Sequence, residues 1–198
     1  MLVVGGIGPG NPKYLTIDMR IRIEEGKYIL AFGRVAASLR EIRDDIVQVN
    51  KVEEILNYIA PDRETLLLAS GDPNFYGIVD FLKAKGLTIR EVIPGLSSFQ
   101  YMMSKLQKSW QHAFFLSLHG REESLEDIGF HQLSILLADK DNTAGKISND
   151  LYKLGIRGKV YAGFNLSYED EKIIVKNIGE KIQTLSSLGV VVVENEMD

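Results

Sequence analysis

Ser70-Gly71-Asp72-Pro73-Asn74-Phe75-Tyr76-Gly77 follows the apolar run 65–69 and precedes a segment with helical periodicity. A buried strand that runs into such a loop delivers it to the carboxyl edge of a parallel sheet, where open α/β folds bind their ligands. Gly71 permits a positive φ or the close approach of a ligand, Pro73 fixes the turn, and Asp72 places a carboxylate at its tip. These residue types also make ordinary strand-to-helix turns, so the octapeptide alone leaves both interpretations open.

Two further glycine turns follow strand-like runs. Residues 2–4 lead into Gly5-Gly6-Ile7-Gly8-Pro9-Gly10-Asn11-Pro12, and residues 89–93 lead into Pro94-Gly95-Leu96-Ser97-Ser98-Phe99-Gln100. If their strands share one parallel sheet, all three turns gather on one edge of it. The two serine hydroxyls of the third turn either cap the following helix or hydrogen-bond a ligand beside its N-terminus.

The first turn departs from the dinucleotide-binding pattern. In Gly-x-Gly-x-x-Gly started at Gly6, the last glycine falls at a position occupied by Asn11. Pro9 also removes a backbone donor where a pyrophosphate would need one. We therefore expect an extended loop followed by a helix over 17–25 that is capped by Thr16, and the pattern argues against a dinucleotide dehydrogenase.

The rest of the chain alternates strands with helices and so predicts an α/β protein of two domains. A mainly parallel first sheet is expected from strands over 28–32, 46–49, 65–69 and 89–93 and helices over 35–43, 52–59, 77–85 and 98–106. The polar stretch 107–111, broken by Trp110, is the best linker and gives domains 1–108 and 109–198. A mixed second sheet with hairpins is expected from strands over 113–118, 133–138, 159–164, 173–178 and 190–194, with a helix over 143–154 and a short one from Gly179.

Composition narrows the function classes. The 198 residues carry a formal net charge of −4, which offers no general attraction for nucleic acid or an anionic membrane. The chain has no cysteine, and its three histidines show no metal-ligand spacing, so no metal site is expected. No apolar run approaches the ~20 residues that span a bilayer, and the N-terminus lacks a signal-peptide pattern, so we expect a cytoplasmic protein.

In their order and spacing the three glycine turns resemble the motifs of the tetrapyrrole (corrin/porphyrin) methylases, which transfer methyl groups from S-adenosylmethionine. Trp110-Gln111, Ser117-Leu118-His119-Gly120-Arg121 and Leu166-Ser167-Tyr168-Glu169-Asp170-Glu171 resemble the branch that methylates C5 of a cobalt-precorrin macrocycle in cobalamin (vitamin B12) biosynthesis. The resemblance covers essentially the whole chain. Its small departures are the doubled glycine Gly5-Gly6, Leu96 where isoleucine is common, and Ala144 where proline is expected.

This resemblance implies two α/β domains with the cofactor cleft between them, usually in a homodimer. It implies a corrinoid substrate, S-adenosylmethionine as cofactor, and a separate partner enzyme for C15 methylation and decarboxylation, because this chain is too short for a second methylating domain. Carried over residue by residue, the expected cofactor contacts are Pro9, Asp72, Phe75, Ser97 and Ser98 and, in the second domain, Leu137, Ala138, Gly163, Phe164 and Leu188.

Transfer of a sulfonium methyl group to an electron-rich carbon needs alignment and no nucleophilic side chain. The acetate and propionate arms of a corrinoid call for guanidinium groups, which makes Arg121 the first candidate for binding or catalysis. His119 could move a proton or bind a carboxylate, and Tyr14 could stack on the ligand. Each of these residues also has a purely structural interpretation. His119 could be an ordinary loop histidine, Arg121 could pair with Glu122 or Glu123, and Tyr14 could be an aromatic side chain that covers the core. We expect the acidic run 169–171 to be a solvated turn.

Two other functions stay open from the sequence. A methylase of the same family could act at another ring position, and a non-catalytic module could bind S-adenosylmethionine without transferring its methyl group.

Overall fold

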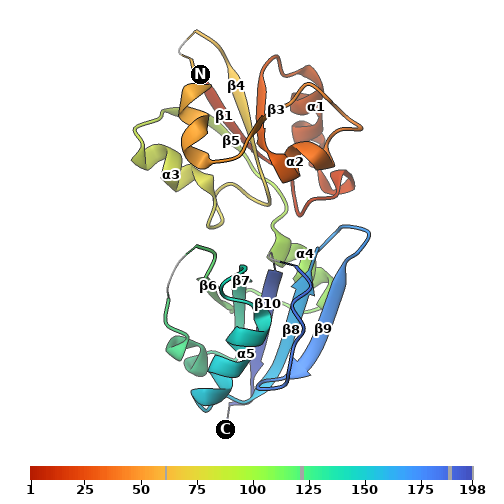
Figure 1. Ribbon diagram of the computed structural model, residues 1–198, viewed down its shortest axis with the longest axis vertical. Coiled ribbons are helices and arrows are strands. Elements are labelled where there is room, and N and C mark those ends of the chain that lie inside the picture. The colour runs from red at the N-terminus through yellow and green to blue at the C-terminus, as the bar shows by residue number, and fades with distance from the viewer. Residues whose placement is uncertain (61, 121–122, 187–188, 198) are drawn as a thin grey trace. The chain divides into compact units, whose positions relative to one another are not determined.

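The computed structural model describes residues 1–60, 62–120, 123–186 and 189–197. The chain divides into two compact units, Met1–Ser98 and Phe99–Asp198 (Figure 1). The division falls at the start of helix α4 (Ser98–Leu106) rather than after Lys108, where the linker composition placed it. Lys108 forms an ion pair with Glu194 at 2.6 Å, and Phe99 packs against Trp110 with ring centroids 5.1 Å apart. Helix α4 therefore belongs with the second unit.

The first unit is built on a parallel sheet. Within the described residues it has five strands in the order β3-β2-β4-β1-β5, and every pairing between neighbours is parallel. The strands are β1 (Leu2–Gly6), β2 (Ile29–Phe32), β3 (Val47–Val49), β4 (Thr65–Ala69) and β5 (Ile89–Ile93). The predicted α/β class with a mainly parallel first sheet is confirmed.

Helices cover both faces of this sheet, which explains the nearly continuous apolar runs in its central strands β2, β4 and β1. Val3, Leu66 and Leu68 join a cluster with residues of α1 (Ile17–Glu25) and α2 (Gly33–Ser38). Their neighbours Val4 and Leu67 point to the other face. There they pack with α3 (Ile78–Ala84) and the 3₁₀ helix η2 (Val52–Asn57). Figure 1 shows α1 and α2 on one side of the sheet and α3 on the other.

Two helices of the first unit differ from the sequence prediction. The helix expected over 35–43 ends at Ser38, and the one expected over 52–59 is the 3₁₀ helix η2. Arg43 takes another role, because its guanidinium donates to the backbone oxygens of Ile23 and Glu24 at the end of α1. These side-chain bonds satisfy carbonyls that the end of a helix leaves without partners. A further 3₁₀ helix, η1 (Pro12–Tyr14), was not predicted.

The second unit contains the mixed sheet that the sequence predicts. Its described strands run in the order β6-β7-β10-β8-β9, with β6 and β7 parallel and the other pairs antiparallel. They are β6 (Phe114–Ser117), β7 (Leu133–Ala138), β8 (Gly158–Phe164), β9 (Lys172–Asn177) and β10 (Gly189–Asn195). The helices are α4, α5 (Ala144–Lys153) and the 3₁₀ helix η3 (Glu126–Phe130). The short helix expected from Gly179 is wrong: Gly179 has φ +93°, and Glu180 closes a turn onto Asn177 instead.

Helix α5 lies across one face of the second sheet (Figure 1). Its Ile147 and Leu151 share a cluster with Val191 and Val193 of β10. Helix α4 covers the opposite face, since a Cβ at Gly163 of β8 would stand 2.6 Å from the sulfur of Met102 in α4. Among the residues that the structure describes, no helix is long and apolar enough to cross a membrane.

Candidate functional site

The three glycine turns meet at one edge of the first sheet, as predicted. Because β1 lies between β4 and β5, the turns that follow these strands become neighbours. The backbone N–H of Gly71 donates to the oxygen of Gly8 at 2.8 Å. A Cβ at Gly6 would stand 2.5 Å from the oxygen of Gly71 and 2.7 Å from the nitrogen of Gly95. Real Cβ atoms do not approach backbone so closely, so the turns can meet only because glycine occupies these positions.

In the first turn, Pro9 is buried and Gly8 adopts φ +80°, a left-handed conformation suited to glycine. The turn continues into η1, where Tyr14 is half-buried. The backbone oxygen of Tyr14 lies 3.1 Å from the position of a Cβ at Gly8, so η1 folds back against the turn. The side-chain role expected for Tyr14 stays a prediction.

In the second turn, the carboxylate of Asp72 accepts a hydrogen bond from the backbone N–H of Asn74 at 2.8 Å. This contact shapes the turn from within and uses one carboxylate oxygen. Phe75 and Tyr76 stack edge to face with ring centroids 5.0 Å apart, and Tyr76 adopts φ +48°. A positive φ at a tyrosine is uncommon and marks a tightly constrained loop.

The third turn brings the two predicted serines beside the second. Ser97 is buried, and Ser98 is half-buried at the first position of α4. The Cα of Ser97 lies 3.7 Å from the position of a Cβ at Gly71, which has φ +67°. The structure therefore brings the predicted residues Pro9, Asp72, Phe75, Ser97 and Ser98 onto three adjoining turns.

The second sheet aligns its predicted residues in rows at one edge. Leu137 of β7 and Gly163 of β8 are both paired with Val190 of β10. In the next row Ala138 and Phe164 are both paired with Gly189. The four residues therefore lie side by side at the ends of neighbouring strands. The remaining predicted residue, Leu188, lies outside the described part of the chain.

The segment after β6 reaches the same edge. The N–H of Leu118 donates to the oxygen of Leu137 at 3.0 Å, and His119 and Gly120 follow with Gly120 at φ +64°. Asp139 directly follows β7, and its carboxylate accepts a hydrogen bond from the N–H of Gly120 at 2.8 Å. Sequence reasoning missed Asp139, although Asp-x-x-Asn after a strand is a recognisable turn pattern. Arg121, the first candidate for substrate binding, lies outside the described residues.

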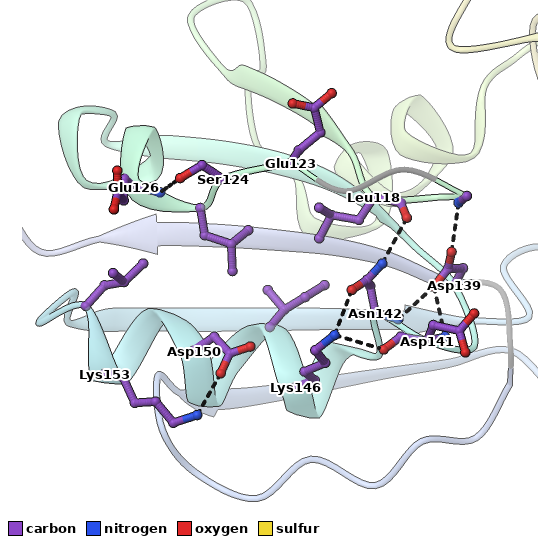
Figure 2. A pocket seen from close by; sticks show the side chains of 14 residues that line it. Leu118, Glu123, Ser124, Glu126, Asp139, Asp141, Asn142, Lys146, Asp150 and Lys153 are labelled. Atoms are coloured by element: carbon purple, nitrogen blue, oxygen red, sulfur yellow. Dashed lines mark hydrogen bonds and ion pairs between the residues drawn. The ribbon is translucent and has the colours of Figure 1, made fainter.

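A cavity of about 890 Å³ opens between this segment and helix α5 (Figure 2). Leucine and isoleucine side chains form its apolar part, among them Leu125 and Ile147. Carboxylates outnumber lysines in its described lining, and Lys146 and Lys153 both donate to neighbouring oxygens. The described lining therefore does not suit a polycarboxylate.

The acidic run 169–171 is only partly the solvated turn that the sequence predicts. Glu169 is exposed, but the carboxylate of Glu171 accepts from the N–H of Ser167 at 2.6 Å and pairs with Lys105 of α4 at 3.5 Å. Burial alone would raise the pKa of Glu171, yet hydrogen bonds from Tyr101 and Ser167 and the charge of Lys105 bring the pKa below its usual value. Glu171 therefore anchors the loop after β8 to helix α4.

The glycine turns of the first sheet and the aligned edge of the second can be compared with those of known proteins. A family model described as Tetrapyrrole (Corrin/Porphyrin) Methylases matches residues 1–182, and the chain belongs to this family. It is 30% identical over 195 residues to the probable cobalt-precorrin-7 C(5)-methyltransferase of Methanocaldococcus jannaschii, covering 91% of this chain and 90% of that protein.

Solved structures share the fold. The precorrin-6Y methylase of cobalamin biosynthesis from Archaeoglobus fulgidus superposes with a TM-score of 0.78 at 21% identity, covering 100% of this chain and 98% of that one. A uroporphyrin-III C-methyltransferase of Thermus thermophilus, solved with S-adenosylhomocysteine, gives a TM-score of 0.76 at 20% identity, covering 98% and 91%. Among the described residues, no group of three or more His, Cys, Asp or Glu side chains is arranged to hold a metal ion.

Proposed function

We propose that this protein is a cobalt-precorrin-7 C5-methyltransferase that uses S-adenosylmethionine in cobalamin biosynthesis. The observation that carries the proposal is the 30% identity to the Methanocaldococcus jannaschii relative, because it extends over nine-tenths of both chains. Membership of the methylase family supports the reaction class.

The residues at the two sheet edges fit the proposed cofactor. A nucleoside linked to an amino acid presents ribose hydroxyls, polar base edges and a charged amino-acid group. Asp72 offers an acceptor for hydroxyls, Ser97 and Ser98 offer hydroxyl groups at the start of a helix, and the edge at Ala138 and Phe164 offers backbone groups. We propose that these groups bind the cofactor.

The bound cofactor supplies an activated methyl group on a sulfonium centre. What the chain must then provide is alignment of the acceptor carbon and exclusion of water, and alignment contributes roughly 7–11 kcal/mol to such reactions. The glycine turns suit this role, because backbone held by mutual contact is rigid. We assign substrate contacts to His119, Arg121 and Tyr14, and we propose that Arg121 binds the acetate and propionate groups of the corrinoid.

Calorimetric titration with S-adenosylmethionine, S-adenosylhomocysteine and NAD tests the cofactor. We expect micromolar binding of both sulfur compounds and none of NAD. Binding of NAD without S-adenosylhomocysteine would overturn the proposal.

Incubation with cobalt-precorrin-7 and carbon-13-methyl S-adenosylmethionine tests the reaction. A labelled product with its new methyl group at C5 is expected by mass and carbon-13 shift. Methylation at another ring position would assign a different member of the family, and the absence of transfer with intact cofactor binding would assign a binding module.

Three further proposals concern the protein's context. We propose a homodimer, which analytical ultracentrifugation tests directly. A separate enzyme for C15 methylation and decarboxylation is proposed as partner, and co-purification without such activity would count against it. A cytoplasmic location is proposed as well, which cell fractionation tests.

A further inference from the structure

Asp139 lies where the two parts of the second-unit site meet. It follows Ala138, the last residue of β7, whose row is aligned with Gly189 and Phe164. Its side chain reaches across to the segment after β6, which carries His119. One residue therefore connects the expected cofactor edge with the expected substrate loop.

The two carboxylate oxygens of Asp139 have different partners. Oδ1 accepts from the N–H of Asp141 at 2.9 Å and of Asn142 at 2.7 Å, which closes a turn within its own loop. Oδ2 accepts from the N–H of Gly120 at 2.8 Å, which is the bond between the loops. The dashed lines in Figure 2 show both sets of bonds. A substitution that preserves one oxygen can therefore separate the two functions.

A second bond holds the other side of His119. The side-chain amide of Asn142 donates to the oxygen of Leu118 at 3.1 Å, and its own oxygen accepts from Lys146 at 3.0 Å. The residues on both sides of His119 are thus fixed by the loop that follows β7. Gly120 has φ +64°, so the peptide that presents its N–H to Asp139 is held in a left-handed conformation.

The bonds to Asp139 are made to a charged group. Backbone hydrogen bonds from Gly120 and Asn142 hold the pKa of Asp139 below its usual value, with burial acting in the opposite direction. Asp139 is consequently ionised at neutral pH, and charge-assisted bonds of this kind are stronger than neutral ones.

We propose that Asp139 is a positioning residue that fixes the His119 loop for recognition of the corrinoid, with Asn142 as its second fastening. This inference rests on the proposed function. Neither residue touches the reacting atoms; both act through the backbone on either side of His119.

The test uses Asp139→Asn in the full-length protein. The new side chain retains one oxygen for the turn within the loop, but its amide nitrogen faces the N–H of Gly120, so only the bond between loops is lost. Asn142→Asp is the second variant, because it replaces the donor to Leu118 while keeping an acceptor for Lys146. Asp150→Asn is the matched control: it makes the same charge change in the same cavity, and Asp150 pairs with Lys153 at 2.8 Å, away from the His119 loop.

Three measurements are made on each variant: steady-state kinetics with cobalt-precorrin-7, calorimetric binding of S-adenosylhomocysteine, and hydrogen exchange of the Gly120 amide by NMR. Asp139→Asn and Asn142→Asp are each expected to raise KM for the corrinoid about tenfold, with a smaller effect on kcat. In Asp139→Asn the exchange of the Gly120 amide is expected to rise by a similar factor, about tenfold. Cofactor affinity should stay the same, and Asp150→Asn should match the parent protein throughout.

An unchanged KM in Asp139→Asn, with an active parent, would overturn the inference and leave the proposed function standing. An equal loss of cofactor affinity would also overturn it, because Asp139 would then support the sheet edge in general. A parent protein that binds the cofactor but does not methylate the corrinoid would overturn the proposed function, and this inference with it.

Discussion

The backbone oxygen of Gly71 lies 2.5 Å from the position that a Cβ would occupy at Gly6, although the two residues are 65 positions apart in the sequence. Replacing Gly6 with alanine must therefore displace the second turn, the third turn or both. We expect Gly6→Ala to lower the free energy of unfolding by about 1–3 kcal/mol, as overpacking in a rigid site does. Affinity for S-adenosylhomocysteine should fall with it.

Urea unfolding and calorimetric titration check this expectation. Gly129→Ala is the matched control, since a Cβ there would meet Ile156 at an ordinary 3.7 Å. Equal stability and affinity in Gly6→Ala and the parent would contradict the close approach of the turns.

Asp72 has two roles that a pair of variants can separate. Its carboxylate accepts a hydrogen bond from the N–H of Asn74 at 2.8 Å, and in the proposed function it also binds the cofactor. Asp72→Asn keeps an acceptor for the turn, whereas Asp72→Ala removes it. We expect Asp72→Ala to weaken binding of S-adenosylhomocysteine by about tenfold or more, and Asp72→Asn by less. If calorimetry gave parent affinity for both, Asp72 would serve the turn alone.

Thr16 caps the start of helix α1. Its hydroxyl oxygen accepts from the N–H of Met19 at 3.1 Å, which is the N-cap bond that the sequence predicts. Thr16→Ala should therefore cost about 1 kcal/mol of unfolding free energy with unchanged kcat. Thr16→Ser, which keeps the hydroxyl, should restore most of the stability. A loss shared by both variants would point to the lost methyl group.

Glu171 should make the protein's stability depend on pH. Its pKa is lowered in the folded chain, so its stabilising contribution is present above its unfolded pKa and disappears as pH falls through the lower folded value. We expect Glu171→Gln to reduce Tm by a constant amount between about pH 6 and 8, and the gap to the parent to narrow as pH falls below the ordinary glutamate pKa of about 4.3.

Glu169→Gln serves as the control for this series, because Glu169 is exposed on the same loop. Thermal unfolding across the pH range checks the result. A gap between Glu171→Gln and the parent that stayed constant into acid would show that the charge of Glu171 is not what anchors the loop.

The first sheet and its turns could be predicted from the sequence because its central strands are buried on both faces and glycine turns follow them. Thr65–Ala69 is a buried, largely apolar strand, and both it and Ile89–Ile93 run into glycine turns and begin and end where the sequence predicts. Parallel pairing then left one place for the turns to meet. The residue types in the turns and the parallel order of the strands therefore predict the same position for the three glycine turns.

Other features depend on contacts that no local pattern encodes. Residues 35–43 have helical periodicity, but α2 ends at Ser38, and the side chain of Arg43 contacts the end of α1, a segment that the local pattern does not reveal. The bond between Asp139 and Gly120 joins residues on different loops. The prediction of a solvated turn failed at Glu171 for the same reason, since its partner Lys105 lies on helix α4, far away in the sequence.

The position of β10 in the second sheet has a consequence for synthesis of the chain. β10 is paired on both sides, with β7 and β8, and both aligned rows of the candidate site include one of its residues. While a ribosome is still making residues 189–195, the backbone edges of β7 and β8 that later pair with β10 have no partner. Until the central strand of the second sheet emerges, these unpaired edges are open to pairing with the wrong segment.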